Sequence, residues 1–273
     1  MPLDLVRRLL TPLRDPVATS RYPEAAPLLQ FATRGMPEID PALCDGSGEC
    51  AEACPTEAIE LGISGAIRAI DAGRCIFCSA CVIACPKGAL SMGSRVELAA
   101  ADRTELIKAA PPATSVRPLD GQVRRQVLSR MGRSLHVRHL DAGSCNGCDW
   151  ECAALLNPYH DIQRLGIDFV ASPRHADLLL VTGVMTRNLE EAARRTYEAM
   201  PEPRLVVAVG ACAISGGVFA GSPEARDGIA GVVPVDVFVP GCPPRPEALI
   251  EALLKAIELG RASRPEVAAA RPE

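Results

Sequence analysis

The arrangement of its twelve cysteines constrains this 273-residue chain more than any other feature. Seven of them lie between residues 36 and 100 and form two repeats at a constant offset: Cys44, Cys50 and Cys54, then Cys75, Cys78, Cys81 and Cys85. The second repeat reads C-x2-C-x2-C-x3-C-P without a gap. A chain of this length does not need disulfides to fold, so cysteines grouped in this way indicate metal binding.

The spacing of the second repeat is typical of cubane iron–sulfur clusters. Three thiolates on one tight loop reach three corners of a cubane, whereas the fourth, followed by proline, reaches the other cluster. We therefore predict a cluster A held by Cys44, Cys50 and Cys85, and a cluster B held by Cys54, Cys75, Cys78 and Cys81. Structural zinc, the main alternative, takes four ligands, which leaves unexplained why seven cysteines form two repeats with Cys-Pro ends.

One position departs from the repeat, because Ser47 stands where Cys78 lies in the second half. Three outcomes are open for cluster A. Ser47 ligates the fourth iron, that iron is absent and a [3Fe–4S] cluster remains, or the site is empty. We rank loss or weakening of one iron first and an empty site last, since three cysteines are retained.

A second group of cysteines follows predicted strands. Four apolar runs predict strands at 135–140, 177–182, 204–209 and 235–239, and helical patterns lie between them, notably at 188–200 and 246–259. This alternation predicts a parallel α/β sheet. Loops at the carboxyl ends of parallel strands meet at one edge. Four thiolates are therefore expected to share one further cluster there: Cys145, Cys148, Cys212 and Cys242.

Three residues near this group have competing interpretations. Cys152 has no partner in the pattern and is expected to be a small buried hydrophobic side chain. Glu151 lies at the start of a predicted helix, where it either caps the helix or relays protons beside the cluster. His139 is expected to make ordinary hydrogen bonds, with a supporting role for the first ligand loop as the alternative.

The remaining segments set the domain organisation. Residues 1–35 contain an amphipathic pattern that predicts an N-terminal arm, packed on protein or lying on a membrane surface. Residues 36–100 are expected to form a domain, 101–133 a linker with a helix at 119–131, 134–260 a second domain, and 261–273 a flexible tail. The net charge of −4 and the 3% aromatic content argue against a nucleic-acid partner. No run is apolar enough for a leader or a membrane span, which favours a reducing cytoplasm.

These motifs resemble known families. Residues 36–100 resemble two-cluster ferredoxins and, with the arm, the ferredoxin-like subunit of energy-converting hydrogenases and respiratory complex I. Residues 134–259 are similar to the small subunit of group 4 membrane-bound [NiFe] hydrogenases and to the terminal-cluster subunit of complex I. The similarity rests on these runs: 143–151, 171–177, 181–183, 201–203, 210–212, 235–237 and 240–244.

The resemblance implies an α+β ferredoxin-like domain fused to a flavodoxin-like domain that carries one [4Fe–4S] cluster, the proximal cluster. It implies an electron-transfer subunit peripheral to the cytoplasmic side of the inner membrane. The expected partners are a [NiFe] large subunit that holds the catalytic centre, antiporter-like membrane subunits, and an electron donor or acceptor protein. Complex I has adjacent cysteines where this chain has C-x2-C, the hydrogenase pattern, but a nickel-free complex I-like assembly remains the alternative.

Overall fold

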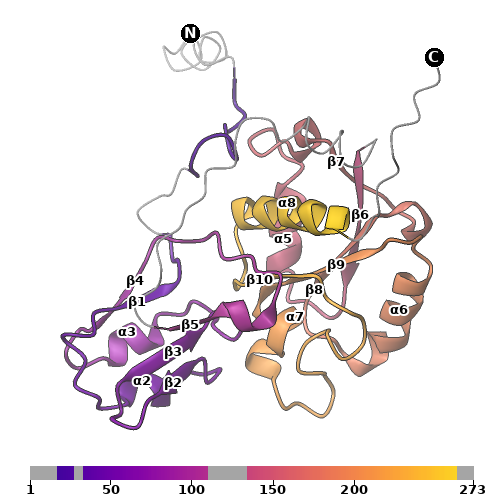
Figure 1. The fold of residues 1–273 in the computed structure, drawn as a ribbon. Coiled ribbons are helices and arrows are strands. Elements are labelled where there is room, and N and C mark those ends of the chain that lie inside the picture. Colours follow the sequence, from indigo (N-terminus) through magenta and orange to yellow (C-terminus); the bar gives the residue numbers. More distant parts are fainter. Residues whose placement is uncertain (1–16, 28–32, 110–133, 263–273) are drawn as a thin grey trace, which may run out of the picture.

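The computed structural model describes residues 17–27, 33–109 and 134–262. It contains two lobes, each with its own strands (Figure 1). The predicted arm helix within 1–16 and the helix at 119–131 lie outside the described residues, as does the predicted tail of 261–273 except for residues 261 and 262, which continue a helix. None of the helices that the structure describes is both long and apolar enough to cross a membrane.

The first lobe is a small α+β domain. Its elements are β1 (Pro37–Ile39), α2 (Glu49–Glu52), β2 (Ile59–Leu61), β3 (Ile67–Asp71), α3 (Ala80–Ala84), β4 (Leu90–Met92), η1 (Arg103–Leu106) and β5 (Ile107–Ala109). Strands β1 and β4 pair antiparallel, and β2, β3 and β5 form a three-stranded antiparallel sheet. The sequence repeat therefore becomes two short helices, each preceded by one cysteine loop, as predicted for a ferredoxin-like domain.

The second lobe is a five-stranded parallel sheet with helices on both faces, which confirms the predicted flavodoxin-like class. Its strands run in the order β10-β9-β8-β6-β7. Its strands and α-helices are β6 (Leu135–Asp141), α5 (Gly147–Ala154), β7 (Ile167–Phe169), β8 (Leu178–Thr182), α6 (Arg187–Glu198), β9 (Leu205–Val209), α7 (Gly210–Ser215), β10 (Val237–Val239) and α8 (Pro246–Ala262). Three-residue β7 escaped the sequence analysis because so short an edge strand leaves little pattern.

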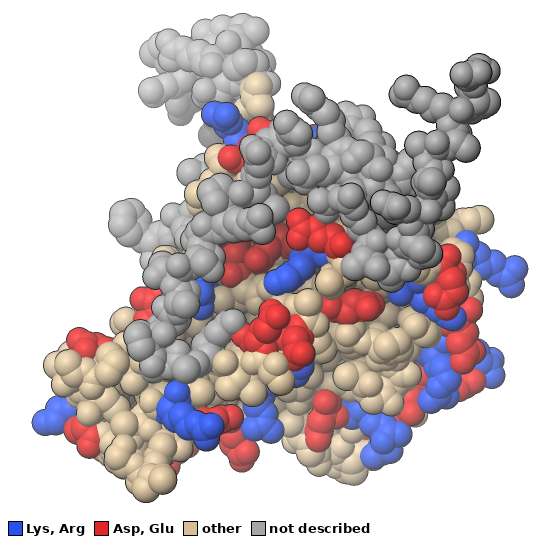
Figure 2. Space-filling model, in the orientation of Figure 1, with Lys and Arg blue, Asp and Glu red and all other residues tan. Residues whose placement is uncertain are grey.

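Two apolar layers hold the sheet between its helices. Strands β8 and β9 are buried along their whole length, as expected for parallel strands covered on both faces. Alternate strand residues pack on α5 and α8 on one face and on α6 and α7 on the other. The helix predicted at 246–259 is observed as α8, and one of its faces is buried: Ala248, Leu249, Leu253, Ala256 and Ile257. Along the right edge of Figure 2, where α6 lies, acidic and basic side chains are mixed.

The two lobes share one apolar core. The layer on the α6 and α7 face continues into the first lobe through Ala72, Leu98 and Leu106. Ala100 exchanges two backbone hydrogen bonds with Phe238 of edge strand β10, at 2.8 and 3.0 Å. The start of the predicted linker is also ordered, because η1 and β5 lie within 101–109 and β5 pairs with β3. The linker prediction was wrong for these residues, whose strand pairing is long-range and leaves no local signal.

A partly buried polar contact ties α8 to the segment between β4 and η1 of the first lobe. The Ala99 amide donates to Glu251 Oε2 at 3.2 Å, and Lys255 Nζ donates to the Ala99 carbonyl at 2.8 Å. The pKa of Glu251 is raised from 4.5 to about 7, chiefly by burial; the Ala99 hydrogen bond and Lys255 oppose this shift, and the Glu97 carboxylate contributes to it. The folded chain therefore binds a proton at Glu251 more tightly than the unfolded chain does.

This shift predicts a pH-dependent contribution to stability. The contribution of Glu251 is fully present below about pH 4.5 and is lost as the pH rises to about 7. Glu251→Gln keeps an acceptor for Ala99 and cannot ionise. We expect the substitution to raise the free energy of unfolding by up to about 3 kcal/mol at pH 8, with little effect at pH 4.5. Chemical unfolding at both pH values measures the difference, and an equal effect at the two would contradict it.

Candidate iron–sulfur sites

The cysteines of the first lobe form two groups that cross the sequence repeat. Burial raises the pKa of the Cys50 thiol, and the neighbouring Cys85 and Cys44 raise it further. Four other cysteines line one small cavity together with Ile59, Ile70 and Phe77: Cys54, Cys75, Cys78 and Cys81. The structure therefore brings Cys54 beside the second repeat and Cys85 beside the first.

Backbone amides support the two Cys-Pro cysteines in the same way. The Ala58 amide donates to Cys54 Sγ at 3.3 Å, and the Ala89 amide donates to Cys85 Sγ at 3.2 Å. Both donors lie four residues after their cysteine, so the two repeats present the same backbone hydrogen bond to sulfur. An N–H directed at sulfur stabilises the thiolate, the form that binds iron.

The third group lies at the carboxyl edge of the parallel sheet. Cys145 follows β6, Cys148 lies in the first turn of α5, Cys212 lies in α7 after β9, and Cys242 follows β10. Burial raises the pKa of the Cys148 thiol, and the nearby Cys152, Cys212, Cys242 and Cys145 add to the shift. The four predicted ligands are therefore close neighbours in the structure.

A glycine makes this edge narrow enough for the thiols to approach. Gly210 has a φ of 84°, and a Cβ there would lie 2.8 Å from Cys148 Sγ. Only glycine adopts this backbone conformation readily and leaves room for the sulfur. A side chain at this position would displace the thiol of Cys148.

The donor set of each group fits an iron–sulfur cluster. Burial and mutual repulsion raise the pKa values of the thiols, to about 12 at Cys75 and about 11 at Cys81 and Cys212. Such thiols ionise only when cations offset their charge, which bound iron supplies. Within the described residues, no three His, Cys, Asp or Glu side chains could hold a single metal ion. Cysteines around a cubane are spread over the corners of a larger body.

Ser47 lies on the exposed loop between Cys44 and Cys50. Its backbone amide donates to Asp45 Oδ1 at 3.0 Å. This hydrogen bond, with a weaker one from the Ser47 side chain, lowers the pKa of the exposed Asp45 carboxyl. The first group thus holds three cysteines, and beside them lies a loop with a serine and an aspartate.

A polar network behind the third group escaped the sequence analysis. Asp149, which directly follows Cys148, accepts a hydrogen bond from Thr182 Oγ1 at 2.5 Å and another from the Ser144 hydroxyl. His139 Nε2 lies 3.0 Å from Asp149 Oδ1 and 2.9 Å from Thr182 Oγ1. Burial lowers the pKa of His139. The sequence predicted only that His139 lies near the ligand loop. The contact with Thr182 was not predicted, because Thr182 lies on another strand.

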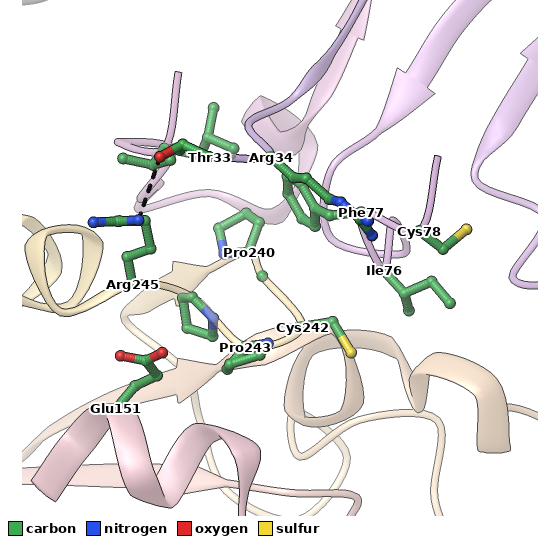
Figure 3. Close-up of a pocket in the computed structure, with 14 residues that line it drawn as sticks. Thr33, Arg34, Ile76, Phe77, Cys78, Glu151, Pro240, Cys242, Pro243 and Arg245 are labelled. Carbon is green, nitrogen blue, oxygen red and sulfur yellow. Dashed lines mark hydrogen bonds between the residues drawn. The ribbon is translucent and has the colours of Figure 1, made fainter. Parts of the chain in front are cut away.

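Cys152 and Glu151 differ in their surroundings. Cys152 is buried in the apolar layer under α8, as expected for a small hydrophobic side chain. Glu151 lines a cavity of about 440 Å³, and its carboxylate points toward Arg245 (Figure 3). Burial raises the pKa of Glu151, and Arg245 opposes the shift. The proton-relay role of Glu151 stays a prediction.

The same cavity separates the second and third cysteine groups. Cys78 lines it from the first lobe and Cys242 from the second (Figure 3). Burial raises the pKa of the Cys242 thiol, and the nearby Cys145 and Cys78 add to the shift. Cys78 and Cys242 thus line one cavity from the two lobes and are close enough to interact electrostatically.

Comparisons with known proteins assign a family to each lobe. A 4Fe–4S dicluster domain matches residues 36–86, and the 20 kDa subunit of NADH ubiquinone oxidoreductase matches residues 145–256. The chain is 49% identical to a probable membrane-bound hydrogenase subunit, mbhJ, of Pyrococcus furiosus, a match that covers 49% of this chain and 80% of the relative.

Two other relatives are matched over less of their length. Formate hydrogenlyase subunit 7 of Escherichia coli is 42% identical, over 50% of this chain and 54% of the relative. An NADH-quinone oxidoreductase subunit of Desulfovibrio desulfuricans is 48% identical, over 41% of this chain and 61% of the relative. The chain thus spans between half and two thirds of these two proteins.

Proposed function

The chain belongs to the NADH ubiquinone oxidoreductase 20 kDa subunit family, and on this basis we propose that it is the electron-transfer subunit of a membrane-associated [NiFe] hydrogenase-type complex. Its relatives are subunits of a membrane-bound hydrogenase, of formate hydrogenlyase and of NADH-quinone oxidoreductase. The chain is accordingly an oxidoreductase subunit with an electron-transfer role, and its partners are other subunits of such a complex.

The observation that carries the proposal is the adjacency of the second and third cysteine groups through Cys78 and Cys242. Iron–sulfur clusters accept and release single electrons, and the protein sets their spacing and surroundings. With the dicluster domain in the same chain as the 20 kDa-type domain, electrons can cross from one lobe to the other without a change of subunit.

We assign the ligands by group. Cluster B is held by Cys54, Cys75, Cys78 and Cys81, and the proximal cluster by Cys145, Cys148, Cys212 and Cys242. Cluster A has Cys44, Cys50 and Cys85, with Ser47 or an open position at the fourth iron. This gives two [4Fe–4S] clusters and a third that is either [3Fe–4S] or a [4Fe–4S] cluster with one ligand other than cysteine. Asp149, Thr182 and His139 hold the loop of Cys145 and Cys148 in place.

The surface around the proximal group supports docking of a large subunit that holds the catalytic centre. Trp150 is 75% exposed beside Cys148, and Val218 and Phe219 are half-exposed after α7. Cys145 and Cys242 are themselves exposed. Large apolar side chains at a surface commonly mark a protein interface. The membrane arm of the complex and its antiporter-like subunits, on the cytoplasmic side, complete the proposed assembly.

Metal analysis of the complex purified with this chain tests the assignment. We expect iron in excess of two full cubanes per chain and nickel in the associated large subunit. Iron without nickel would instead favour the complex I-like alternative, to which the similarity to the Desulfovibrio desulfuricans relative also points. Zinc in place of iron, or a chain purified as a stable free monomer, would contradict both assignments.

A further inference from the structure

The loop that enters cluster B touches the helix that carries Cys212. Gly73, two residues before Cys75, places its carbonyl oxygen 3.0 Å from the hydroxyl of Ser215 at the end of α7. A Cβ on Gly73 would lie 2.9 Å from Ile214 Cγ2 and 2.8 Å from the guanidinium carbon of Arg103. Gly73 is therefore enclosed between the two lobes, and a side chain there would require Arg103 or Ile214 to shift.

An ion pair fixes the first-lobe side of this contact. Both terminal nitrogens of Arg103 donate to the buried Asp71 carboxylate, at 2.8 and 2.6 Å. The same carboxylate accepts from the Gly73 amide at 2.8 Å, and the Asp71 carbonyl accepts from the Cys75 amide at 3.0 Å. A bidentate pair of this kind is geometrically specific. It braces the turn that leads into Cys75, a proposed ligand of cluster B.

The second-lobe side is equally tied to cluster ligands. Ile214 and Ser215 follow Cys212 in the same short helix, and Gly217, just beyond it, lies close enough that a Cβ there would be 3.1 Å from Cys212 Sγ. A further contact between the lobes, the backbone pairing of Ala100 with Phe238, lies four residues before Cys242. The contacts between the lobes thus lie close to the cysteine loops of each lobe.

We propose that Gly73 and Ser215 form a joint that fixes the separation of cluster B from the proximal cluster, with Gly73 as a positioning residue. The inference rests on the proposed ligand assignment. Electron transfer slows steeply as the edge-to-edge distance grows, so a close contact beside the ligands sets the rate between the clusters. Glycine at 73 allows the lobes to approach, and the hydroxyl of Ser215, which lies 3.0 Å from both the Gly73 and the Ala211 carbonyl oxygens, links α7 to the Gly73 loop.

Gly73→Ala tests the joint in the complete complex. Its methyl group would lie 2.8 Å from the guanidinium carbon of Arg103 and 2.9 Å from Ile214 Cγ2, so these side chains must shift, and a shift of Ile214 moves α7 away from the Gly73 loop. With cluster B and the proximal cluster both reduced, we expect a weaker magnetic interaction between them in the EPR spectrum and slower transfer between them in rapid-freeze experiments. Iron content and the spectrum of each separate cluster are expected to stay unchanged. Gly231→Ala is the matched control, because a Cβ on that exposed glycine meets nothing within 4 Å.

Ser215→Ala provides a second variant that adds no bulk and removes the hydroxyl that faces Gly73. It is expected to weaken the magnetic interaction between the clusters less than Gly73→Ala does. If Gly73→Ala loses iron, Ser215→Ala alone tests whether the joint fixes the separation of the clusters. The joint would be overturned if Ser215→Ala kept its full iron content, its magnetic interaction between the clusters and its transfer rate. The same three results must hold for Gly73→Ala, if that variant also retains its iron. Absence of the two cluster signals from the unmodified complex would instead overturn the proposed function.

Discussion

Cys242→Ala is expected to remove the proximal cluster and with it the electron-transfer activity of the complex. Cys242 follows β10 and is the only cysteine that this loop brings to the carboxyl edge of the sheet. Three thiolates would remain at this edge of the sheet, from which electrons are proposed to pass to the partner subunit. The iron content should fall, the EPR signal of the proximal cluster should disappear, and hydrogen turnover with the large subunit should be lost.

Cys152→Ala is the matched control for this experiment. Cys152 lies one helical turn beyond Cys148, yet it is only 3% exposed and packs in the apolar layer under α8. Its loss should leave iron content and turnover unchanged, with a small loss of stability from the missing sulfur. If Cys152→Ala lost iron and Cys242→Ala kept it, the assignment of the third group would be wrong.

Ser47→Cys is expected to add one iron to cluster A. The repeat places Ser47 where Cys78 lies in the complete site, and the Ser47 loop is exposed, so a thiol there is accommodated without repacking. A fourth thiolate completes the set of Cys44, Cys50 and Cys85. A [3Fe–4S] cluster gives its EPR signal when oxidised and a [4Fe–4S] cluster gives one when reduced, so conversion moves the signal from one state to the other.

The control for this gain is Ser94→Cys, which places a thiol on an exposed turn after β4, outside the three cysteine groups. It should change neither the iron count nor the spectrum. If Ser47→Cys changed neither the iron count nor the EPR spectrum, the missing fourth cysteine would not be what determines the iron content of cluster A.

Much of the site could be predicted because iron–sulfur ligation depends on local spacing. The C-x2-C-x2-C-x3-C-P run places three thiolates on one loop whatever surrounds it. The positions of Cys145, Cys212 and Cys242 followed from a second regularity, that parallel strands end at one edge. The first regularity depends on neighbours in the sequence, and the second depends on the strand arrangement of a common fold class.

The contacts that escaped prediction join residues distant in sequence. Gly73 and Ser215 are 142 residues apart, and Asp149 meets Thr182 across 33 residues. Strand β5 lies in a segment without cysteines. It pairs with β3 through backbone groups, which do not depend on residue type, so this pairing leaves no sign in the sequence.

The sequence by itself determined the class of each lobe and predicted which cysteines share a cluster, because cluster ligation and strand burial impose local patterns on residue type. Only the tertiary structure decided how the lobes meet: that Cys78 and Cys242 line one cavity, that Gly73 is enclosed by Arg103 and Ile214, and that burial raises the pKa of Glu251. These features depend on the packing of distant segments, for which a glycine, a serine or a glutamate in the sequence gives no sign.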